Sequence, residues 1–296
     1  MKQKVVVKLM GGLGNQMLQF ATGFALAQKL NATLFLDTSY YKISHKKGDT
    51  PRAFELEHFN VAYKSYKHPI ISNYIAQMFF GKYSHLRKYI LPLFGIKYLT
   101  DADQLGALEI KAPLVYLDGY WQSNNYFNAQ YSNIVSAFTL KENLQLKLQN
   151  FLNGVAGRTA VAVHIRRTDY LLPHSSHHVL DVQYYNAAIN YIKQLHPQAV
   201  FYFFGDDHHW IKENFDIDGT IKILVNENFG SNSYLDLTFM SACQHIIISN
   251  STFSWWAAYL NQNSDKIIIA PQKWFLPGKS GGFNYDSFIP NHWIKI

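Results

Sequence analysis

The chain has 296 residues, of which 48% are hydrophobic and 16% charged, and its formal net charge is +7. This length suits about two domains, and the composition excludes a largely disordered chain. A basic protein attracts phosphates, membranes or nucleic acid, but the sequence has no long Lys/Arg run and no nucleic-acid motif, so we expect no nucleic-acid partner. A lone cysteine, Cys243, and the lack of a signal peptide or membrane-spanning run predict a cytoplasmic protein without disulfides.

The first part of the chain predicts a βαβ opening, in which a β-branched run stops at Gly11 and Gly12 before a helical apolar pattern begins. The short connections favour a parallel sheet. Residues 40–110 are less regular. The expected strands lie at 4–10, 32–41 and 113–123, and the expected helical segments at 15–30, 72–80 and 84–94.

From residue 159 onward, apolar strands alternate with helical patterns, and unbroken apolar strands indicate burial on both faces of a sheet. A break near "NGVAGRT" separates this part from the first. The pattern predicts an α/β protein with Rossmann-like domains over 1–155 and 156–296. The expected strands lie at 159–165, 199–205, 221–225, 244–249 and 266–270, and the expected helices at 182–195, 233–243 and 253–262.

Polar residues gather where the strands of the second domain end. These ends read "HIRRTD", "FFGDD", "VNEN", "ISNSTFSWW" and "IAPQKWF", while the strand bodies are almost free of polar groups. In open α/β sheets, ligands bind beyond the carboxyl ends of the strands. We therefore expect a binding site at this edge of the sheet.

Two adjacent arginines, Arg166 and Arg167, follow the strand at 159–165, and Asp169 stands close behind them. A structural Arg–Asp salt bridge is one explanation of this arrangement. The hydroxyl-rich helix start in "SNSTFSWW" favours another, because a helix N-terminus and an arginine fork both bind phosphate oxygens. Together the two features predict a cradle for a diphosphate.

The glycine turn "GGLGNQ" has two explanations. Gly12 and Gly14 match the start of the dinucleotide-binding fingerprint, and Asp37 stands near the expected ribose-binding acid, but Met17 occupies the position of the third glycine. The turn therefore fits an NAD-dependent oxidoreductase or a close backbone approach between two domains. An oxidoreductase would leave the arginine and hydroxyl motifs unexplained.

Two short acidic motifs, "DAD" at 101–103 and "DID" at 216–218, resemble the paired carboxylates that hold a divalent ion beside a nucleotide-sugar. Neither motif follows an apolar strand. An arginine and a helix terminus supply the positive charge that such an ion would provide. We therefore expect neither a metal nor another cofactor.

Three stretches together resemble the α-1,2-fucosyltransferases of glycosyltransferase family eleven: "GGLGNQMLQFATGFALA", "VHIRRTDY" and "DLTFMSACQHIIISNSTFSWWAAYL". "GYWQSNNYF" and "IIIAPQKWF" fit the same family. The motif "HIRRTD" is shared with α-1,6- and protein O-fucosyltransferases, so by itself it indicates fucosyl transfer rather than a particular linkage. The similarity extends over residues 8–275.

The resemblance implies a GT-B fold with two Rossmann-like domains facing a central cleft. It also implies an inverting, metal-independent transfer of L-fucose from GDP-β-L-fucose to the 2-hydroxyl of a terminal β-galactoside in an oligosaccharide. GDP-fucose is then a co-substrate rather than a cofactor. Transfer of fucose in another linkage, and a non-catalytic nucleotide- or glycan-binding protein of the same fold, stay open as alternatives.

Residue roles follow from the same resemblance. The first arginine of the motif grips the β-phosphate in related enzymes, which implies this role for Arg166, and the asparagine of the glycine turn lies near the reacting centre, which implies Asn15. The motif histidine lies close to the guanosine. The implied donor-binding residues are Gly12, Gly14, His164, Arg166, Arg167, Asp206, Asp236, Asn250, Ser251, Thr252, Phe253 and Ser254.

A carboxylate that accepts the proton of the acceptor hydroxyl is expected, and Asp37, Asp118 and Asp169 stay open as candidates. The acceptor is expected between the domains, on the side of the first. Aromatic residues at a strand end stack on the apolar face of galactose or serve equally well in packing between domains. The expected acceptor-binding residues are Asp118, Tyr120, Trp121 and Gln122. The net positive charge fits donor steering or a loose peripheral association with a membrane.

Overall fold

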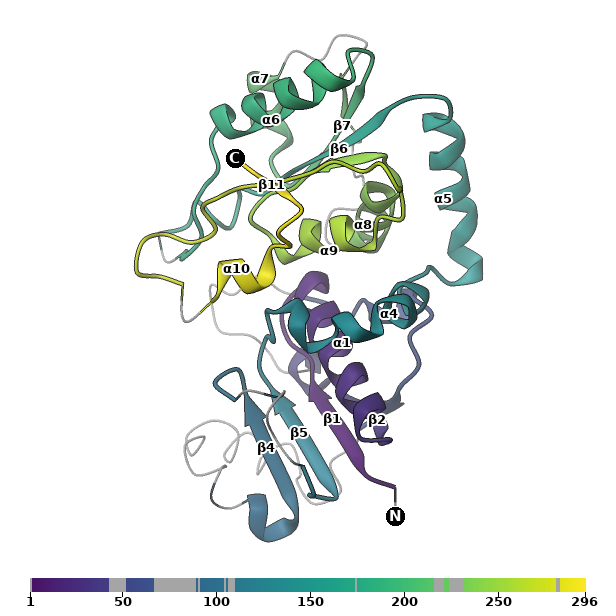
Figure 1. Cartoon of the computed structure of the whole chain (residues 1–296), viewed down its shortest axis with the longest axis vertical. Helices are drawn as coiled ribbons and strands as arrows, with labels where there is room; N and C mark the ends of the chain where they lie inside the picture. The colour runs from purple at the N-terminus through teal and green to yellow at the C-terminus, as the bar shows by residue number, and fades with distance from the viewer. Residues whose placement is uncertain are drawn as a thin grey trace. The chain divides into compact units, whose positions relative to one another are not determined.

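The computed structural model describes residues 2–42, 52–66, 89, 91–103, 105, 110–173, 175–215, 221–223, 232–280 and 283–296. The chain divides into two compact units, drawn in Figure 1. Unit 1 comprises Met1–Glu57 and Val61–Ala137, and unit 2 comprises His58–Asn60 and Phe138–Ile296.

The division falls before helix α5 (Glu142–Val155), whereas the sequence pattern placed it after that helix. The reason is packing on unit 2, because the ring of Phe151 in α5 stacks on Phe239 with centroids 4.6 Å apart. A polar helix that ends at a glycine-containing segment resembles a linker in the sequence, and only the stacked ring of Phe239 reveals which unit the helix covers.

A three-residue excursion, His58–Asn60, also belongs to unit 2. Phe59 forms an isolated antiparallel bridge with Leu140, and the ring of His58 stacks on Tyr234 with centroids 3.9 Å apart. Phe59 is fully buried. The excursion is therefore packed into unit 2 although unit 1 precedes and follows it in the chain.

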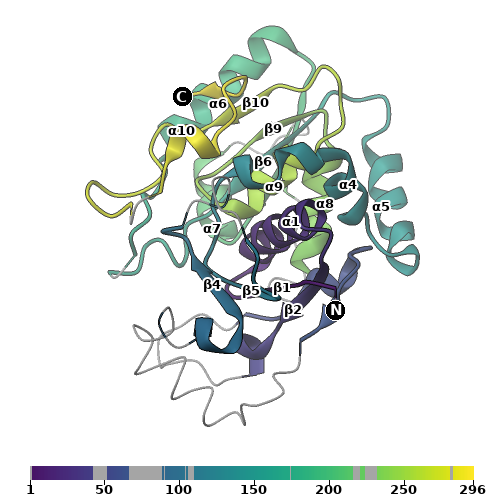
Figure 2. The ribbon, with the colours of Figure 1, turned by 60° about the horizontal axis from the view of Figure 1, so that its bottom comes forward.

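Unit 1 contains a parallel sheet with the strand order β3-β2-β1-β5-β4. Figures 1 and 2 show β2, β1, β5 and β4 side by side in that order. The strands are β1 Lys4–Lys8, β2 Thr33–Asp37, β3 Lys64–Ser65, β4 Ile96–Thr100 and β5 Leu114–Asp118. The predicted βαβ opening is confirmed. Of the two expected helical segments at 72–80 and 84–94, the first lies outside the described residues, and the end of the second forms a 3₁₀ helix at Leu91–Phe94.

Helix α1 (Leu13–Lys29) packs closely on this sheet. A Cβ atom placed on Gly23 would lie 2.0 Å from Cγ2 of Val7 in β1. Glycine inside a helix is less favourable than alanine by roughly 0.5–1 kcal/mol. The close approach of helix and strand explains why glycine is nevertheless present.

Unit 2 contains a second parallel sheet, with the strand order β11-β10-β9-β6-β7-β8. The five strands predicted from the sequence are all present, and residues 224–225 of the third lie outside the described residues. The strands are β6 Ala160–Ile165, β7 Val200–Gly205, β8 Ile221–Ile223, β9 His245–Ile247, β10 Ile268–Ala270 and β11 Ile294–Lys295.

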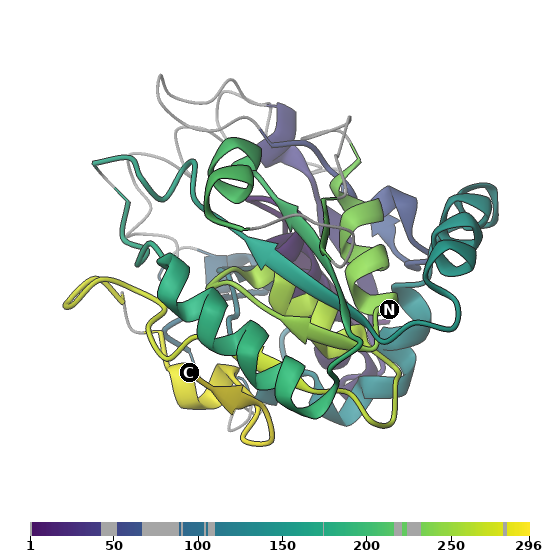
Figure 3. The same ribbon diagram turned by 90° about the horizontal axis from the view of Figure 1, so that it is seen from above.

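Helices cover both faces of the unit 2 sheet, as the unbroken apolar strands predict. Figure 3 shows α6 in front of the sheet and the yellow-green α9 behind it. On the face behind, Phe151 of α5 contacts Tyr202 of β7, and Phe253 of α9 contacts His164 of β6. Besides α5, the described part of unit 2 contains α6 Val182–Leu195, α8 Ser233–Ala242 and α9 Thr252–Leu260, and the shorter helices α7 His208–Asn214 and α10 Tyr285–Phe288. Helix α4, Tyr131–Ala137, belongs to unit 1.

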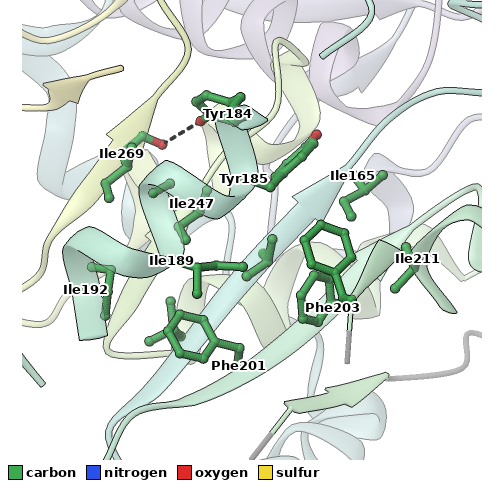
Figure 4. Close-up of a cluster of buried hydrophobic side chains, with 14 of the residues drawn as sticks. Ile165, Tyr184, Tyr185, Ile189, Ile192, Phe201, Phe203, Ile211, Ile247 and Ile269 are labelled. Carbon is green, nitrogen blue, oxygen red and sulfur yellow. Dashed lines mark hydrogen bonds between the residues drawn. The ribbon is translucent and has the colours of Figure 1, made fainter. Parts of the chain in front are cut away.

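A cluster of buried apolar side chains fills the space between α6 and the sheet, as Figure 4 shows. Alternate strand residues supply it, and both Phe201 and Phe203 are fully buried. The Tyr184 hydroxyl donates a hydrogen bond to the Ile248 carbonyl at 2.6 Å, so its buried polar group is satisfied. Each fully buried large side chain here stabilises the fold by roughly 1.5–3 kcal/mol.

Both sheets contain a point where the strand order reverses. In unit 1 the order runs from β1 to β3 on one side and returns through β5 and β4 on the other, so the reversal lies between β1 and β5. In unit 2 it lies between β6 and β9. The crevice beyond the carboxyl ends of the strands at such a switch point is where open α/β sheets bind ligands.

No helix in the described part of the chain combines the length and the apolar character that crossing a membrane requires.

Candidate functional site

At the switch point of unit 2, a histidine and a serine join the two flanking strands. Nδ1 of His164, at the end of β6, lies 2.8 Å from Oγ of Ser249, which follows β9. His164 is only 5% exposed, and its ring lies against Phe253. His164 was predicted as a donor-binding residue, whereas Ser249 was missed. The available signal was its place as the first hydroxyl after an apolar strand.

The His164 imidazole is neutral at physiological pH. Burial, and after it the neighbouring positive charge of Arg166, lowers its pKa to about 3. A neutral ring has one nitrogen that donates and one that accepts. His164 therefore offers hydrogen-bonding groups without charge at this edge of the sheet.

Arg166 leaves the end of β6 and is held by two carboxylates. Its Nη2 donates to Oδ2 of Asp169 at 2.5 Å, and its Nη1 lies 3.2 Å from Oδ2 of Asp206. Burial alone would lower the pKa of Arg166, but the two carboxylates outweigh burial and raise it. A guanidinium has five N–H donors, so N–H groups beyond these two contacts can donate hydrogen bonds to an anionic oxygen.

The loop after β7 supports the loop that carries the arginines. Asp206 is almost fully buried and accepts hydrogen bonds from the Arg167 backbone N–H at 2.8 Å and the Thr168 hydroxyl at 2.7 Å. A Cβ atom on Gly205 would lie 2.7 Å from the Ile165 carbonyl oxygen. Glycine therefore lets the ends of β6 and β7 approach closely enough for Asp206 to reach its partners.

Arg167 has different partners from Arg166. Its guanidinium carbon lies 4.1 Å from the centre of the Trp210 ring, its Nε lies 3.4 Å from Asp207, and its Nη1 donates to the Leu180 carbonyl at 3.3 Å. Successive residues of an extended chain point to opposite sides. Arg167, predicted to bind the donor, is thus engaged in packing, and Arg166 is the arginine at the switch point.

Helix α9 begins beside this arginine loop with an N-cap serine. The Ser251 hydroxyl accepts a hydrogen bond from the Phe253 N–H at 3.3 Å, and the first turn contains no acidic residue. Ser251, Thr252 and Phe253 are partly exposed. The positive end of the helix dipole and these groups form an edge suited to phosphate oxygens.

Two other predicted donor-binding residues in this segment are fully buried. Asn250 donates from Nδ2 to the carbonyls of His178 and Trp274, at 2.7 Å each, and Ser254 donates to the Ser249 carbonyl at 3.4 Å. These two side chains therefore hold the backbone around the start of α9 from inside the unit. Asp236 lies in the first turn of α8 and is partly exposed.

An aromatic pair that the sequence did not reveal borders Arg166. The Tyr170 ring centre is 5.9 Å from the guanidinium carbon of Arg166, and His177 stacks on Tyr170 at 4.2 Å. The Tyr170 hydroxyl donates to the Asn250 carbonyl at 3.0 Å. These contacts tie the loop after β6 to the segment after β9.

The switch point of unit 1 is closed by an ion pair. Nζ of Lys8, in β1, lies 3.0 and 3.1 Å from the two carboxylate oxygens of Asp118, in β5. The Tyr98 hydroxyl also donates to Asp118, at 2.6 Å. Gln19 adds a second link, because it accepts from the Met10 N–H at 3.0 Å and donates to the Gly119 carbonyl at 3.1 Å.

Each of the three carboxylates proposed as a base already accepts hydrogen bonds. Asp37 accepts from the Tyr116 hydroxyl at 2.6 Å and from the Ser39 N–H at 2.9 Å. Asp118 is held by its lysine and tyrosine, and Asp169 by its arginine. For the NAD hypothesis, the Asp37 contacts are unfavourable, since both oxygens meant for a ribose have partners within the protein.

The glycine turn of unit 1 is tightly built. Gly11 has a φ of +77°, and a Cβ atom there would lie 2.9 Å from Nδ2 of Asn15. Gly12 caps α1 and lies beside Arg52, while Gly14 is buried in the first helical turn. The turn therefore presents the Asn15 amide folded back over Gly11.

The side chains expected to bind the acceptor differ in how far they are exposed to solvent. Tyr120 is 41% exposed and Gln122 partly so, whereas Trp121 is 1% exposed and its ring packs against Tyr126 at 5.7 Å. The Trp121 side chain is therefore a packing residue. Sequence spacing alone did not show this, because the backbone of Trp121 has an unusual φ of +54°.

The acidic motif at 101–103 is used within the protein. Asp101 accepts from the N–H groups of Tyr120 and Trp121, and Asp103 accepts from the N–H and the hydroxyl of Thr100. Across the described ranges, no three His, Cys, Asp or Glu side chains are grouped to hold a metal ion. The motif at 216–218 lies outside the described residues.

Comparison with solved structures shows the class of fold. The chain is similar to the crystal structure of NodZ alpha-1,6-fucosyltransferase from Bradyrhizobium, soaked with GDP-fucose, with a TM-score of 0.57 at 14% identity over 88% of this chain and 93% of that one. Two parallel α/β units with this topology form the GT-B fold of glycosyltransferases.

Comparison of sequences then shows the family. The model of "Glycosyl transferase family 11" matches residues 1–294, and the chain belongs to this family of glycosyltransferases. It is 34% identical to the O-antigen biosynthesis glycosyltransferase WbnK of Escherichia coli, over 95% of this chain and 98% of that protein. It is 30% identical to an Escherichia coli alpha-1,2-colitosyltransferase, over 99% and 98%. It is 32% identical to galactoside alpha-(1,2)-fucosyltransferase 1 of Bos taurus, over 54% and 47%.

Proposed function

We propose that this glycosyltransferase transfers L-fucose from GDP-β-L-fucose to the 2-hydroxyl of a terminal β-galactoside, with inversion at the sugar carbon and without a metal ion. The observation that carries the proposal is Arg166, held by two carboxylates at the switch point of unit 2 and bordered by the start of α9. Family membership supplies the reaction class.

In the proposed reaction, Arg166 stabilises the leaving group. The acceptor oxygen bonds to the anomeric carbon from the face opposite the phosphate, while the bond from that carbon to the β-phosphate oxygen breaks and GDP leaves with the electron pair. The acceptor proton passes to a carboxylate or to water. A preorganised donor aimed at the charge that develops contributes roughly 3–4 kcal/mol to such a step. Asp169 and Asp206 hold the guanidinium in place beforehand.

The donor-binding residues proposed in unit 2 differ in their roles. His164 and the α9 start, Ser251 to Phe253, would contact the nucleotide, and Asp236 would meet its base or ribose. Asn250, Ser254, Arg167 and Asp206 would support this edge from inside the unit, since their side chains are bonded there. In unit 1, Tyr120 and Gln122 would contact the acceptor.

The names of two relatives support the α-1,2 linkage, and one of them introduces a second candidate donor. One relative is named an alpha-1,2-colitosyltransferase and another an alpha-(1,2)-fucosyltransferase, so both names contain the same linkage. Colitose is L-fucose without its 3-hydroxyl group. GDP-colitose is therefore the second candidate donor, and the resemblance to an O-antigen enzyme favours an acceptor in a bacterial O-antigen unit.

The test is release of GDP from GDP-fucose and, separately, GDP-colitose, with lactose as acceptor and excess EDTA. Acceptor-dependent release by the wild type, and its loss in Arg166→Ala, is the expected result, with the product linkage read by NMR. Arg158→Ala removes an exposed arginine just before β6 and is the matched control. Release that requires an added divalent ion, or a product with another linkage, would contradict the proposal.

A further inference from the structure

The turn that follows β5 is held by an acid from the end of β4. Oδ2 of Asp101 accepts a hydrogen bond from the Tyr120 N–H at 2.8 Å, and Oδ1 accepts from the Trp121 N–H at 2.6 Å. Both carboxylate oxygens are thus used on consecutive backbone amides. Hydrogen bonds to a charged acceptor are stronger than neutral ones, so this contact fixes the turn firmly.

Gly119 makes this contact possible. A Cβ atom on Gly119 would lie 2.7 Å from the Asp101 carboxylate, so any other residue would push the acid away. From the opposite side, Gln19 donates to the Gly119 carbonyl at 3.1 Å. The turn is consequently held from β4 and from α1.

The backbone of Trp121, which donates to Asp101, adopts an unusual conformation. Its φ of +54° lies in the left-handed region, which a bulky residue rarely adopts and which costs about 1–3 kcal/mol. Such a conformation persists only when the surroundings impose it. With Trp121 buried at 1% exposure, the turn directs the preceding residue, Tyr120, outward at 41% exposure.

Tyr120 has the surroundings of a sugar platform. Partial burial, and after it the neighbouring Tyr40, Asp101 and Asp118, raises the pKa of its hydroxyl, which therefore stays protonated and can donate. An exposed aromatic face beside hydroxyl and carboxylate groups suits a hexopyranoside, which has an apolar face and a polar rim.

We propose that Asp101 is a positioning residue that fixes Tyr120 as the platform on which the apolar face of the acceptor sugar stacks. Asp101 acts through the two backbone amides and does not touch the sugar. The inference rests on the proposed glycosyl transfer and adds to it a residue that determines how well the acceptor binds.

The test compares Asp101→Asn with Asp103→Asn, a matched control two positions away whose acid caps Thr100 instead. We expect Asp101→Asn to raise the acceptor KM about tenfold while the GDP-sugar KM stays within about twofold of wild type. Tyr120→Leu should do the same, and Tyr120→Phe should raise the acceptor KM less than Tyr120→Leu, because it keeps the ring and loses only the hydroxyl. Asp103→Asn should leave both constants unchanged.

The double variant Asp101→Asn with Tyr120→Leu separates positioning from a general loss of structure. If Asp101 acts through Tyr120, the double variant has the acceptor KM of Tyr120→Leu alone, because coupled residues are not additive. Multiplied effects, or an unchanged acceptor KM in Asp101→Asn, would overturn the proposal. Asp101→Ser, which keeps one acceptor oxygen, replaces Asp101→Asn if thermal unfolding shows the latter unfolded. A wild type that releases no GDP with either donor refutes the proposed function instead.

Discussion

Each unit contains a parallel sheet with a switch point, and the two switch points hold different chemistry. In unit 1, Lys8 and Asp118 neutralise each other across β1 and β5. In unit 2, neutral His164 and Ser249 join β6 and β9, and the adjoining Arg166 lies between two acids and the start of a helix. One switch point is therefore occupied by an internal ion pair, whereas its counterpart presents an arginine beside a helix start, which is the edge proposed to bind the donor.

The largest expected effect concerns the two adjacent arginines of unit 2. Arg166→Lys should lower kcat/KM by about 100-fold, because an ammonium group cannot contact both acids and a phosphate as a guanidinium does. Arg167→Lys should keep activity within a few-fold and instead lower the free energy of unfolding by roughly 1–2 kcal/mol, through loss of its contacts with Trp210 and Leu180. Steady-state kinetics and urea unfolding of both variants test this, and equal losses of activity would contradict it.

In unit 1 the corresponding change should affect stability. Lys8→Met leaves the mostly buried Asp118 without its cation and should lower the free energy of unfolding by about 2 kcal/mol. GDP binding, measured by calorimetry, should be unchanged. Lys97→Met, at an exposed position of β4, is the control. Weaker GDP binding in Lys8→Met with unaltered stability would remove the distinction between the two switch points.

A smaller effect is expected from the serine at the unit 2 switch point. Ser249→Ala removes the buried partner of His164 and should lower the free energy of unfolding by about 1 kcal/mol, with weaker GDP binding. Ser241→Ala is matched to it, because that hydroxyl donates to Thr238 of its own helix. If the two variants bind GDP equally well, the His164–Ser249 contact has no part in forming the binding edge.

The pH dependence of stability gives the finest test. The pKa of His164 is about 3 in the folded protein and about 6.5 in the unfolded chain. Below about pH 6.5 the unfolded chain takes up a proton that the folded protein does not, so the free energy of unfolding falls as the pH is lowered toward about 3.

His164→Asn lacks this proton, so its free energy of unfolding should fall less between pH 7 and pH 5, by up to about 1.4 kcal/mol per pH unit. Urea unfolding at the two pH values measures the difference, and contributions from His177 and other groups cancel between the proteins. An identical slope in His164→Asn would mean that His164 takes up its proton over the same pH range in the folded protein as in the unfolded chain, and would contradict the prediction.

The sequence predicted the buried strands and their polar ends well, because apolar runs and the residues that stop them are local features. It missed β3, β4 and β11, which are edge strands without an unbroken apolar run. It placed His164 and Arg166 at the carboxyl end of β6, where the structure has them, but it could not assign different partners to the two arginines. That distinction depends on Trp210 and Asp206, which lie far along the chain.

In unit 1, long-range contacts also limited the prediction. The role of Asp101 depends on amides that follow β5, and no local pattern connects them. Trp121 was expected at the acceptor because aromatic residues at strand ends often bind sugars. A backbone reversal enforced by a distant acid buries its ring instead.

The excursion His58–Asn60 has a consequence for anyone who wishes to exchange parts between family members. No single cut separates the two units, since a fragment that starts at Phe138 lacks both the strand partner of Leu140 and the ring stacked on Tyr234. A chimaera that takes unit 1 from a relative must therefore keep these three residues from the parent that supplies unit 2. The boundary for modular engineering is a set of three junctions rather than one.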